Sequence, residues 1–163
     1  MRFDNSPPPA PLHLYPIVRC KPKVPLRVIL LQHSIFGLWT HFWNGKTIAC
    51  SGDELCDACT ANVKDVWAGY IIATALETDL TVLCAVTRPV KTDLDKYKDE
   101  EHGLFGLSVG LQRVGHRKTS PIAVKVGHRN LMHEKIDGRV TRNIILRLFA
   151  DNAGKKMLED RDL

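Results

Sequence analysis

Long apolar segments are missing from the sequence, and this absence limits the classes of protein to which the chain can belong. No run of about 18 apolar residues occurs, so we expect no transmembrane helix and no membrane partner. The first residues, MRFDNSPPPAPL, lack the apolar core of a secretory signal. Cysteines number five, and an odd count without an export signal argues against a disulfide framework. We therefore expect a cytoplasmic protein whose clustered cysteines bind a metal or stay reduced.

Signatures of the common enzyme classes are also missing. The sequence has no glycine-rich phosphate loop and no Gly-x-Ser-x-Gly motif. Apart from His33 and His41, which are discussed below, its histidines are scattered along the chain. A zinc deaminase requires His-x-Glu followed by Pro-Cys-x-x-Cys, which the chain does not contain. We therefore expect a protein that is not an enzyme.

Positive charge is concentrated in one segment of the chain. The overall net charge is +5, but residues 111–149 carry nine Lys and Arg against two Asp and Glu. Such a segment is typical of nucleic-acid binding, because each phosphate contact releases condensed counterions. A solvated basic face is the alternative that charge alone leaves open.

Short apolar and alternating runs predict a mostly β fold. A proline-rich arm over 1–24 precedes a central domain over 25–130, and a helical tail is expected over 131–163, with its helix at 140–158. The strands are expected at 27–32, 38–43, 46–50, 66–73, 81–87, 107–114 and 122–126, with a short helix at 93–98. Short strands with turn signals between them favour a small antiparallel barrel or sandwich.

The strongest chemical signal is a group of one histidine and three cysteines. The ligands predicted for zinc are His41, Cys50, Cys56 and Cys59. A Cys-x2-Cys pair supplies two thiolates from one tight turn and is half of many structural zinc sites. Four protein ligands leave no open position for water, so the predicted zinc is structural. The alternative is that these cysteines are reduced and bind nothing.

The choice of histidine follows from a predicted hairpin. Asn44-Gly45 between two strands is a strong signal for a type I′ turn. With that turn His41 is opposite Ile48 and becomes a diagonal neighbour of Cys50, within reach of a shared zinc ion. His33 lacks this cross-strand argument and is the second choice.

Aromatic and basic residues together predict a binding surface for single-stranded nucleic acid. Sequence-tolerant binders of single strands combine base-stacking aromatic rings with a basic groove. The predicted contact residues are Trp39, Trp43, Trp67, Arg113, Arg117, Lys118 and Arg129. A role of the tryptophans in the apolar core is the competing interpretation.

These residues also carry a resemblance. A hairpin with a zinc loop (Thr40-His41-Phe42, Cys50-Ser51-Gly52 and Cys56–Cys59), with aromatics and a basic segment, resembles the zinc-containing single-stranded-DNA-binding proteins of phages and mobile elements. The resemblance implies an OB-fold and non-catalytic binding of single-stranded DNA or RNA during replication or recombination, with other proteins of those processes as possible partners. The alternative is a zinc-stabilised protein–protein adaptor in a nucleic-acid-processing complex.

Overall fold

A mixed sheet of eight strands forms most of the computed structural model, which describes residues 15–52 and 54–149. The strands are β1 (Ile17–Val18), β2 (Leu26–Leu30), β3 (Phe36–Trp43), β4 (Lys46–Ala49), β5 (Asp65–Ala75), β6 (Leu80–Val86), β7 (Leu107–Arg113) and β8 (Ile122–Arg129). The helices are α1 (Asp57–Thr60), α2 (Arg88–Asp95) and α3 (Gly138–Leu148).

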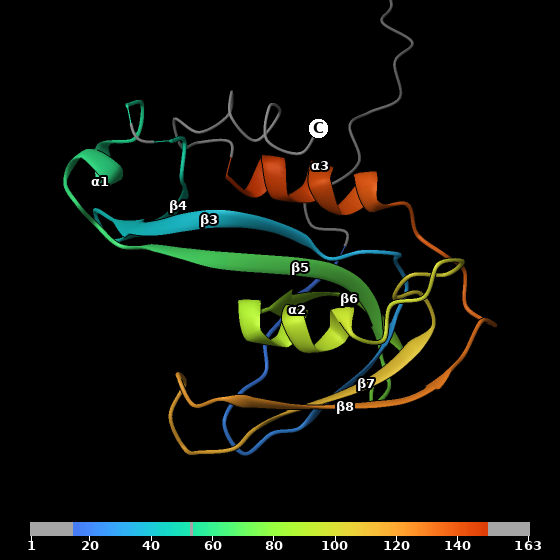
Figure 1. Cartoon of the computed structure of the whole chain (residues 1–163). Helices are drawn as coiled ribbons and strands as arrows, with labels where there is room; N and C mark the ends of the chain where they lie inside the picture. Colours follow the sequence, from blue (N-terminus) through green and yellow to red (C-terminus); the bar gives the residue numbers. More distant parts are fainter. Residues whose placement is uncertain (1–14, 53, 150–163) are drawn as a thin grey trace, which may run out of the picture.

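The long strand β5 organises the sheet. Its first half pairs with β3, and its second half pairs with β2 on one edge and β6 on the other. The main order is β1-β6-β5-β2-β7-β8, and β4 extends the sheet beyond β3. β5 is visibly bent in Figure 1, where the part of the sheet with β3 lies apart from the part with β7 and β8.

An inner apolar cluster lies between these two parts of the sheet. Ile71 and Ala73 of β5 are fully buried there with Val109 of β7. Helix α2 adds Val90 and Leu94, each 1 % exposed. Alternation along β5 explains this arrangement, because every second side chain of a strand points to the same face.

Helix α3 covers the opposite face of β3 and β5 (Figure 1). Its Ile145 is fully buried in a second apolar cluster with Leu38 and Ile72. The buried Gln32 side chain fixes the beginning of this helix: its Oε1 accepts hydrogen bonds from Ile72 N (2.8 Å) and Thr141 Oγ1 (2.7 Å). The sheet therefore carries packed apolar side chains on both faces.

The predicted mostly β fold and the C-terminal helix are confirmed, but the sheet is mixed and does not close into the predicted small antiparallel barrel. β8 pairs only with β7 among the described residues, and β6 pairs with β1 in parallel. Helix α2 contacts both β8 and β5 and covers the inner cluster with Val90 and Leu94. The apolar interior is thus covered by a helix where a barrel would need another strand pair.

The predicted boundaries differ from the observed elements in two places. Part of the 1–24 arm belongs to the sheet through β1, while residues 1–14 lie outside the described part. The predicted helix at 93–98 is α2, which begins earlier because Pro89 is tolerated in a first helical turn. Of the predicted helix at 140–158, the described part ends with α3 at Leu148. None of the described helices has the length and apolar character needed to span a bilayer.

Candidate functional site

The β3–β4 hairpin has the predicted turn and register. Asn44 and Gly45 have φ angles of 49° and 77°, the positive values that a type I′ turn needs at both central positions. His41 is paired with Ile48, and Cys50 N donates a hydrogen bond to Trp39 O at 2.8 Å beyond the end of β4. The hairpin therefore places His41 and Cys50 diagonally across two strands, as predicted.

The loop after β4 brings the other two cysteines back to the hairpin. Gly52 has a φ of 97°, a conformation that glycine adopts without steric cost, and Leu55 N donates to its carbonyl at 3.2 Å. Cys56 is the N-cap of the short helix α1, and Cys59 lies within that helix. The Cys-x2-Cys segment is thus one tight turn.

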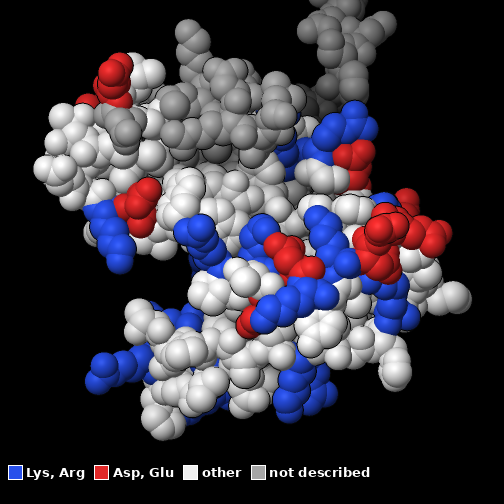
Figure 2. Space-filling model, viewed as in Figure 1, with Lys and Arg blue, Asp and Glu red and all other residues white. Residues whose placement is uncertain are grey.

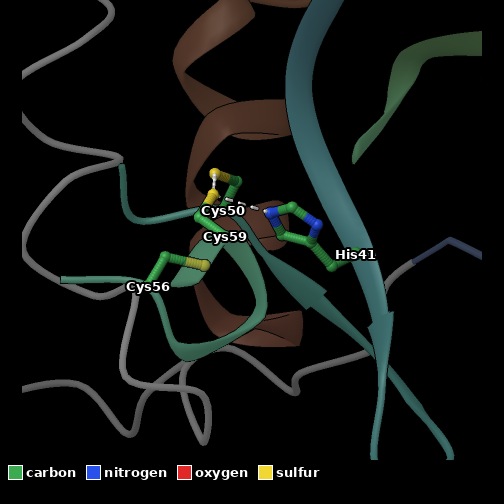
Figure 3. A group of neighbouring side chains, drawn as sticks. All are labelled: His41, Cys50, Cys56 and Cys59. Carbon is green, nitrogen blue, oxygen red and sulfur yellow. Dashed lines mark hydrogen bonds between the residues drawn. The ribbon is translucent and has the colours of Figure 1, made fainter. Parts of the chain in front are cut away.

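The four predicted metal ligands lie together (Figure 3), with their ligand atoms all within 4.8 Å of one another. Cys59 Sγ is 3.4 Å from Cys50 Sγ and 3.3 Å from His41 Nε2. Bond lengths of about 2.0–2.3 Å to a tetrahedral zinc require ligand atoms about 3.3–3.8 Å apart. The cluster can therefore hold a metal ion such as zinc with small movements of its side chains.

His41 is held in the orientation of a metal ligand. Its side chain is buried, at 1 % exposed, and Nδ1 donates a hydrogen bond to the Lys64 carbonyl at 3.3 Å. A neutral ring that donates from Nδ1 presents the Nε2 lone pair to the Cys59 thiol, as in many metal sites whose histidine donates to a backbone carbonyl. His33, the second choice, contacts Ser34 and is not part of the cluster.

The pKa values of Cys56 and Cys59 also fit a site for a cation. Burial raises the pKa of Cys56, but hydrogen bonds from the Cys59 and Ser51 backbones outweigh it and lower that pKa to about 7. The hydrogen bond with Cys50, together with burial, raises the pKa of Cys59 to about 12. Three adjacent thiolates repel one another, whereas a bound divalent cation stabilises all three. This donor set therefore suits a metal better than it suits free thiols.

A hollow of about 280 Å³, here called the hairpin hollow, opens beside the first half of β5 and the end of β6. Its lining includes Thr40, Val66, Trp67, Gly69, Tyr70, Thr87, Arg19, Arg113 and Ile122. One wall is the aromatic wall, defined as β3, β4 and residues 65–70 of β5. The other is the cationic wall, defined as β7, β8 and the turn between them. Figure 2 shows an opening between these parts, with Lys and Arg side chains on both sides.

A second hollow of about 290 Å³, here called the tryptophan hollow, adjoins the first. Its lining is Trp39, Lys64, Asp65, Val66, Trp67, Thr87, Arg88 and Pro89. Trp39 and Trp67 are directly paired across β3 and β5, and the Arg88 guanidinium lies 5.2 Å from the centre of the Trp39 ring. The two hollows share Val66, Trp67 and Thr87, so they form one continuous surface.

Two glycines determine how the indole of Trp67 lies. Gly37 and Gly69 are paired across β3 and β5. A Cβ atom at Gly37 would be 2.1 Å from the Trp67 ring, and one at Gly69 would be 2.3 Å from it. The ring therefore lies directly on the backbone of both strands. Glycine inside a strand often marks such a close approach, and this signal was present in the sequence.

No acidic residue occurs between His102 and His133, a range that includes the whole cationic wall. Arg113 borders the hairpin hollow and donates hydrogen bonds to Cys20 O (2.9 Å) and Ser120 O (2.6 Å). Arg117 and Lys118 are exposed in the turn between β7 and β8. All three are on the wall where phosphate contacts were predicted.

Two of the predicted nucleic-acid contacts, Trp43 and Arg129, line neither hollow. The Arg129 guanidinium donates hydrogen bonds to the carbonyls of Phe105 and Gly103 and forms an ion pair with Asp99 at 3.1 Å. Its charge is therefore used to hold the segment before β7. Trp43 is half-buried near the hairpin turn and lines neither hollow. Sequence reasoning missed Arg19, Lys64 and Arg88, which no local pattern distinguishes from other surface cations.

Comparisons of the chain with protein-family models, curated proteins and solved structures find no match. No family or homologue is therefore identified, and the resemblance to phage single-strand-binding proteins stays a prediction.

Proposed function

We propose that this protein binds single-stranded nucleic acid in the two adjoining hollows. The proposal rests on one observation: the aromatic wall and the cationic wall, which differ in their chemistry, face each other across the hairpin hollow. The aromatic wall offers Trp67, and the cationic wall offers Arg113 with the exposed Arg117 and Lys118. Stacking rings beside a cationic groove are the usual means of holding a single strand without reading its sequence.

The metal cluster has a structural role in this proposal. His41, Cys50, Cys56 and Cys59 would hold one zinc ion, which supplies folding free energy to the end of the aromatic wall. All four positions of a tetrahedral ion are then taken by protein atoms, so the site has no position for a reacting water molecule. His41 and Trp39 belong to the same strand, β3. The backbone carbonyl of Lys64, the residue just before β5, accepts the hydrogen bond from His41. The metal therefore fixes the strands that carry the aromatic side chains.

The strand connections support a comparison with an opened OB-fold. The order β6-β5-β2-β7-β8, with α2 between β6 and β7, is that of a five-stranded barrel whose last closing pair is missing. OB-folds bind oligonucleotides on the face of their second and third strands and with the adjoining loops. Here those strands correspond to β5 and β6, and both hollows lie beside them.

An adaptor role is the second candidate, because apolar side chains are exposed on the aromatic wall. Phe42 is 70 % exposed and Val66 is 59 % exposed. They are diagonal neighbours, since Thr40 is paired with Val66. Such a pair is a small docking surface for a protein and requires no nucleic acid.

A salt-dependent titration separates the two candidates. Fluorescence anisotropy of labelled single-stranded DNA, single-stranded RNA and duplex DNA is measured with the zinc-loaded full chain. We expect single strands to bind more tightly than duplex. The double variant Arg117→Ala, Lys118→Ala should bind more weakly, with a salt slope lower by about 0.7 for each lost phosphate contact. Absence of binding to every single strand at low salt would favour the adaptor and reject the proposal.

A further inference from the structure

The tryptophan hollow contains one acidic side chain among aromatic and cationic ones. Asp65 is exposed, and its carboxylate makes no hydrogen bond or ion pair with any residue that the structure describes. Lys64 and Arg88 line the same hollow and have no ion-pair partner there either. The tryptophan hollow therefore offers a ligand one hydrogen-bond acceptor, Asp65, beside aromatic rings and two cations.

We propose that the tryptophan hollow receives one nucleobase and that Asp65 selects a base with an amino group on its pairing edge. This inference rests on the proposed function and adds a base preference to it. A carboxylate only accepts hydrogen bonds, and guanine offers it two adjacent donors, while cytosine and adenine offer one amino group each. Thymine and uracil present carbonyl oxygens beside a single ring N–H, and these oxygens repel the carboxylate. Guanine is therefore the favoured occupant.

The surroundings of Asp65 suit a planar ring. Trp67 lies on the Gly37–Gly69 backbone pair, so its indole cannot move toward the sheet when a base stacks on it. Arg88 already covers the Trp39 ring at 5.2 Å, which leaves Trp67 as the stacking surface. A volume of about 290 Å³ is close to the small end of ligand pockets, on the order of 300 Å³, and fits one ring system with part of its sugar.

The cations of the two hollows fit the phosphates on either side of this base. Lys64 and Arg88 lie in the tryptophan hollow, and Arg19 and Arg113 lie in the hairpin hollow. Because Trp67 lines both, a strand that passes from one hollow to the other stays in contact with its indole. The selected base therefore lies inside the bound strand and need not be at its end.

The experiment measures how one guanine changes the affinity of an otherwise uniform strand. Oligothymidine of about 12 nucleotides, within the usual range of such sites, is compared with the same strand carrying one central guanine, cytosine or hypoxanthine. For the zinc-loaded full chain we expect guanine to bind about tenfold more tightly than thymine. Strands with cytosine or hypoxanthine, which offer the carboxylate fewer hydrogen-bond donors, should bind with affinities between those of the guanine and thymine strands. The same series in RNA, with uracil as the reference, shows whether the sugar matters.

The decisive variant is Asp65→Asn, which removes the charge from an exposed side chain. We expect its guanine-to-thymine ratio to fall to about one, because an amide can also donate to thymine. Asp79→Asn is the matched control, because Asp79 is exposed in the turn between β5 and β6, at the other end of β5. This variant should keep the tenfold guanine-to-thymine ratio.

The outcomes separate this inference from the proposed function. If the parent binds single strands but shows equal affinity for guanine and thymine, the base selection is wrong while the proposed function stands. An unchanged ratio in Asp65→Asn would also overturn it. If the parent binds none of the strands, the proposed function itself fails.

Discussion

The two walls of the hairpin hollow are held together by different means. The loop that joins β4 of the aromatic wall to β5 buries few apolar side chains among its described residues, chiefly Cys56 and Ala58, and it supplies three of the four clustered ligand residues. The cationic wall buries Leu107, Val109 and Leu111 in the inner cluster and needs no metal. We therefore expect a bound metal to matter most for the loop between β4 and β5, because β3 and β5 of the aromatic wall are themselves packed under α3 through Leu38 and Tyr70.

The largest expected effect is loss of the metal. Cys56→Ser or His41→Ala should abolish stoichiometric zinc, because a three-ligand site loses both a bond and the match to a tetrahedral ion. Metal analysis of freshly purified protein measures this, and Cys56→Ser should also be less soluble. Removal of zinc by a chelator should loosen the aromatic wall without unfolding the cationic wall.

His33→Ala is the matched control, since His33 lies outside the cluster and should leave the zinc content unchanged. Full zinc in Cys56→Ser would show that the ligands are assigned wrongly. Global unfolding on chelation would show that the two walls do not differ as described.

A smaller effect is expected from the apolar side of the comparison. Leu111 is 2 % exposed in the inner cluster. Leu111→Ala should destabilise the whole chain by about 2–5 kcal/mol, through lost apolar burial and the cavity that remains. Denaturant unfolding measures the change, and zinc content should stay at the parent value. Loss of zinc in this variant under native conditions would mean that the walls depend on each other more closely than we infer.

The tryptophans give the next test, because only some of them line the hollows. Trp67→Leu should weaken single-strand binding by about 1–3 kcal/mol with the salt slope unchanged, as for other stacking residues. Trp43→Leu should bind like the parent, since Trp43 borders neither hollow. Thermal melting of both variants checks that they are folded. Equal losses of affinity in the two variants would mean that the nucleic-acid strand binds at the hairpin turn instead.

The smallest expected effect concerns α3, which belongs to neither wall. Hydrogen bonds from the Arg139 side chain and backbone lower the pKa of Asp137, the N-cap of this helix, to about 2. A carboxyl with a pKa below its unfolded value near 3.8 stabilises the fold above that value and loses the effect as the pH falls toward 2. The protection of amides at the beginning of α3, taken relative to the intrinsic exchange rate at each pH, should therefore fall between pH 4 and 2, and Asp137→Asn should remove that dependence. An equal pH dependence in the variant would contradict this assignment.

The parts that sequence predicted well depend on local geometry. The Asn44-Gly45 turn fixes the hairpin register, and the register in turn places His41 beside Cys50. The open sheet could not be predicted in this way, because it depends on α2 packing between distant strands. The role of Arg129 was hidden for a similar reason: two of its partners are backbone carbonyls of Gly103 and Phe105, which no side-chain pattern reveals.

The most direct test of the account is hydrogen exchange of the zinc-loaded full chain with and without a single-stranded oligonucleotide. We predict added protection in peptides that cover 64–69 on the aromatic wall and 113–122 on the cationic wall, and none in α3. Protection confined to α3, or an absence of protection at saturating oligonucleotide, would contradict the binding of a single strand between the two walls.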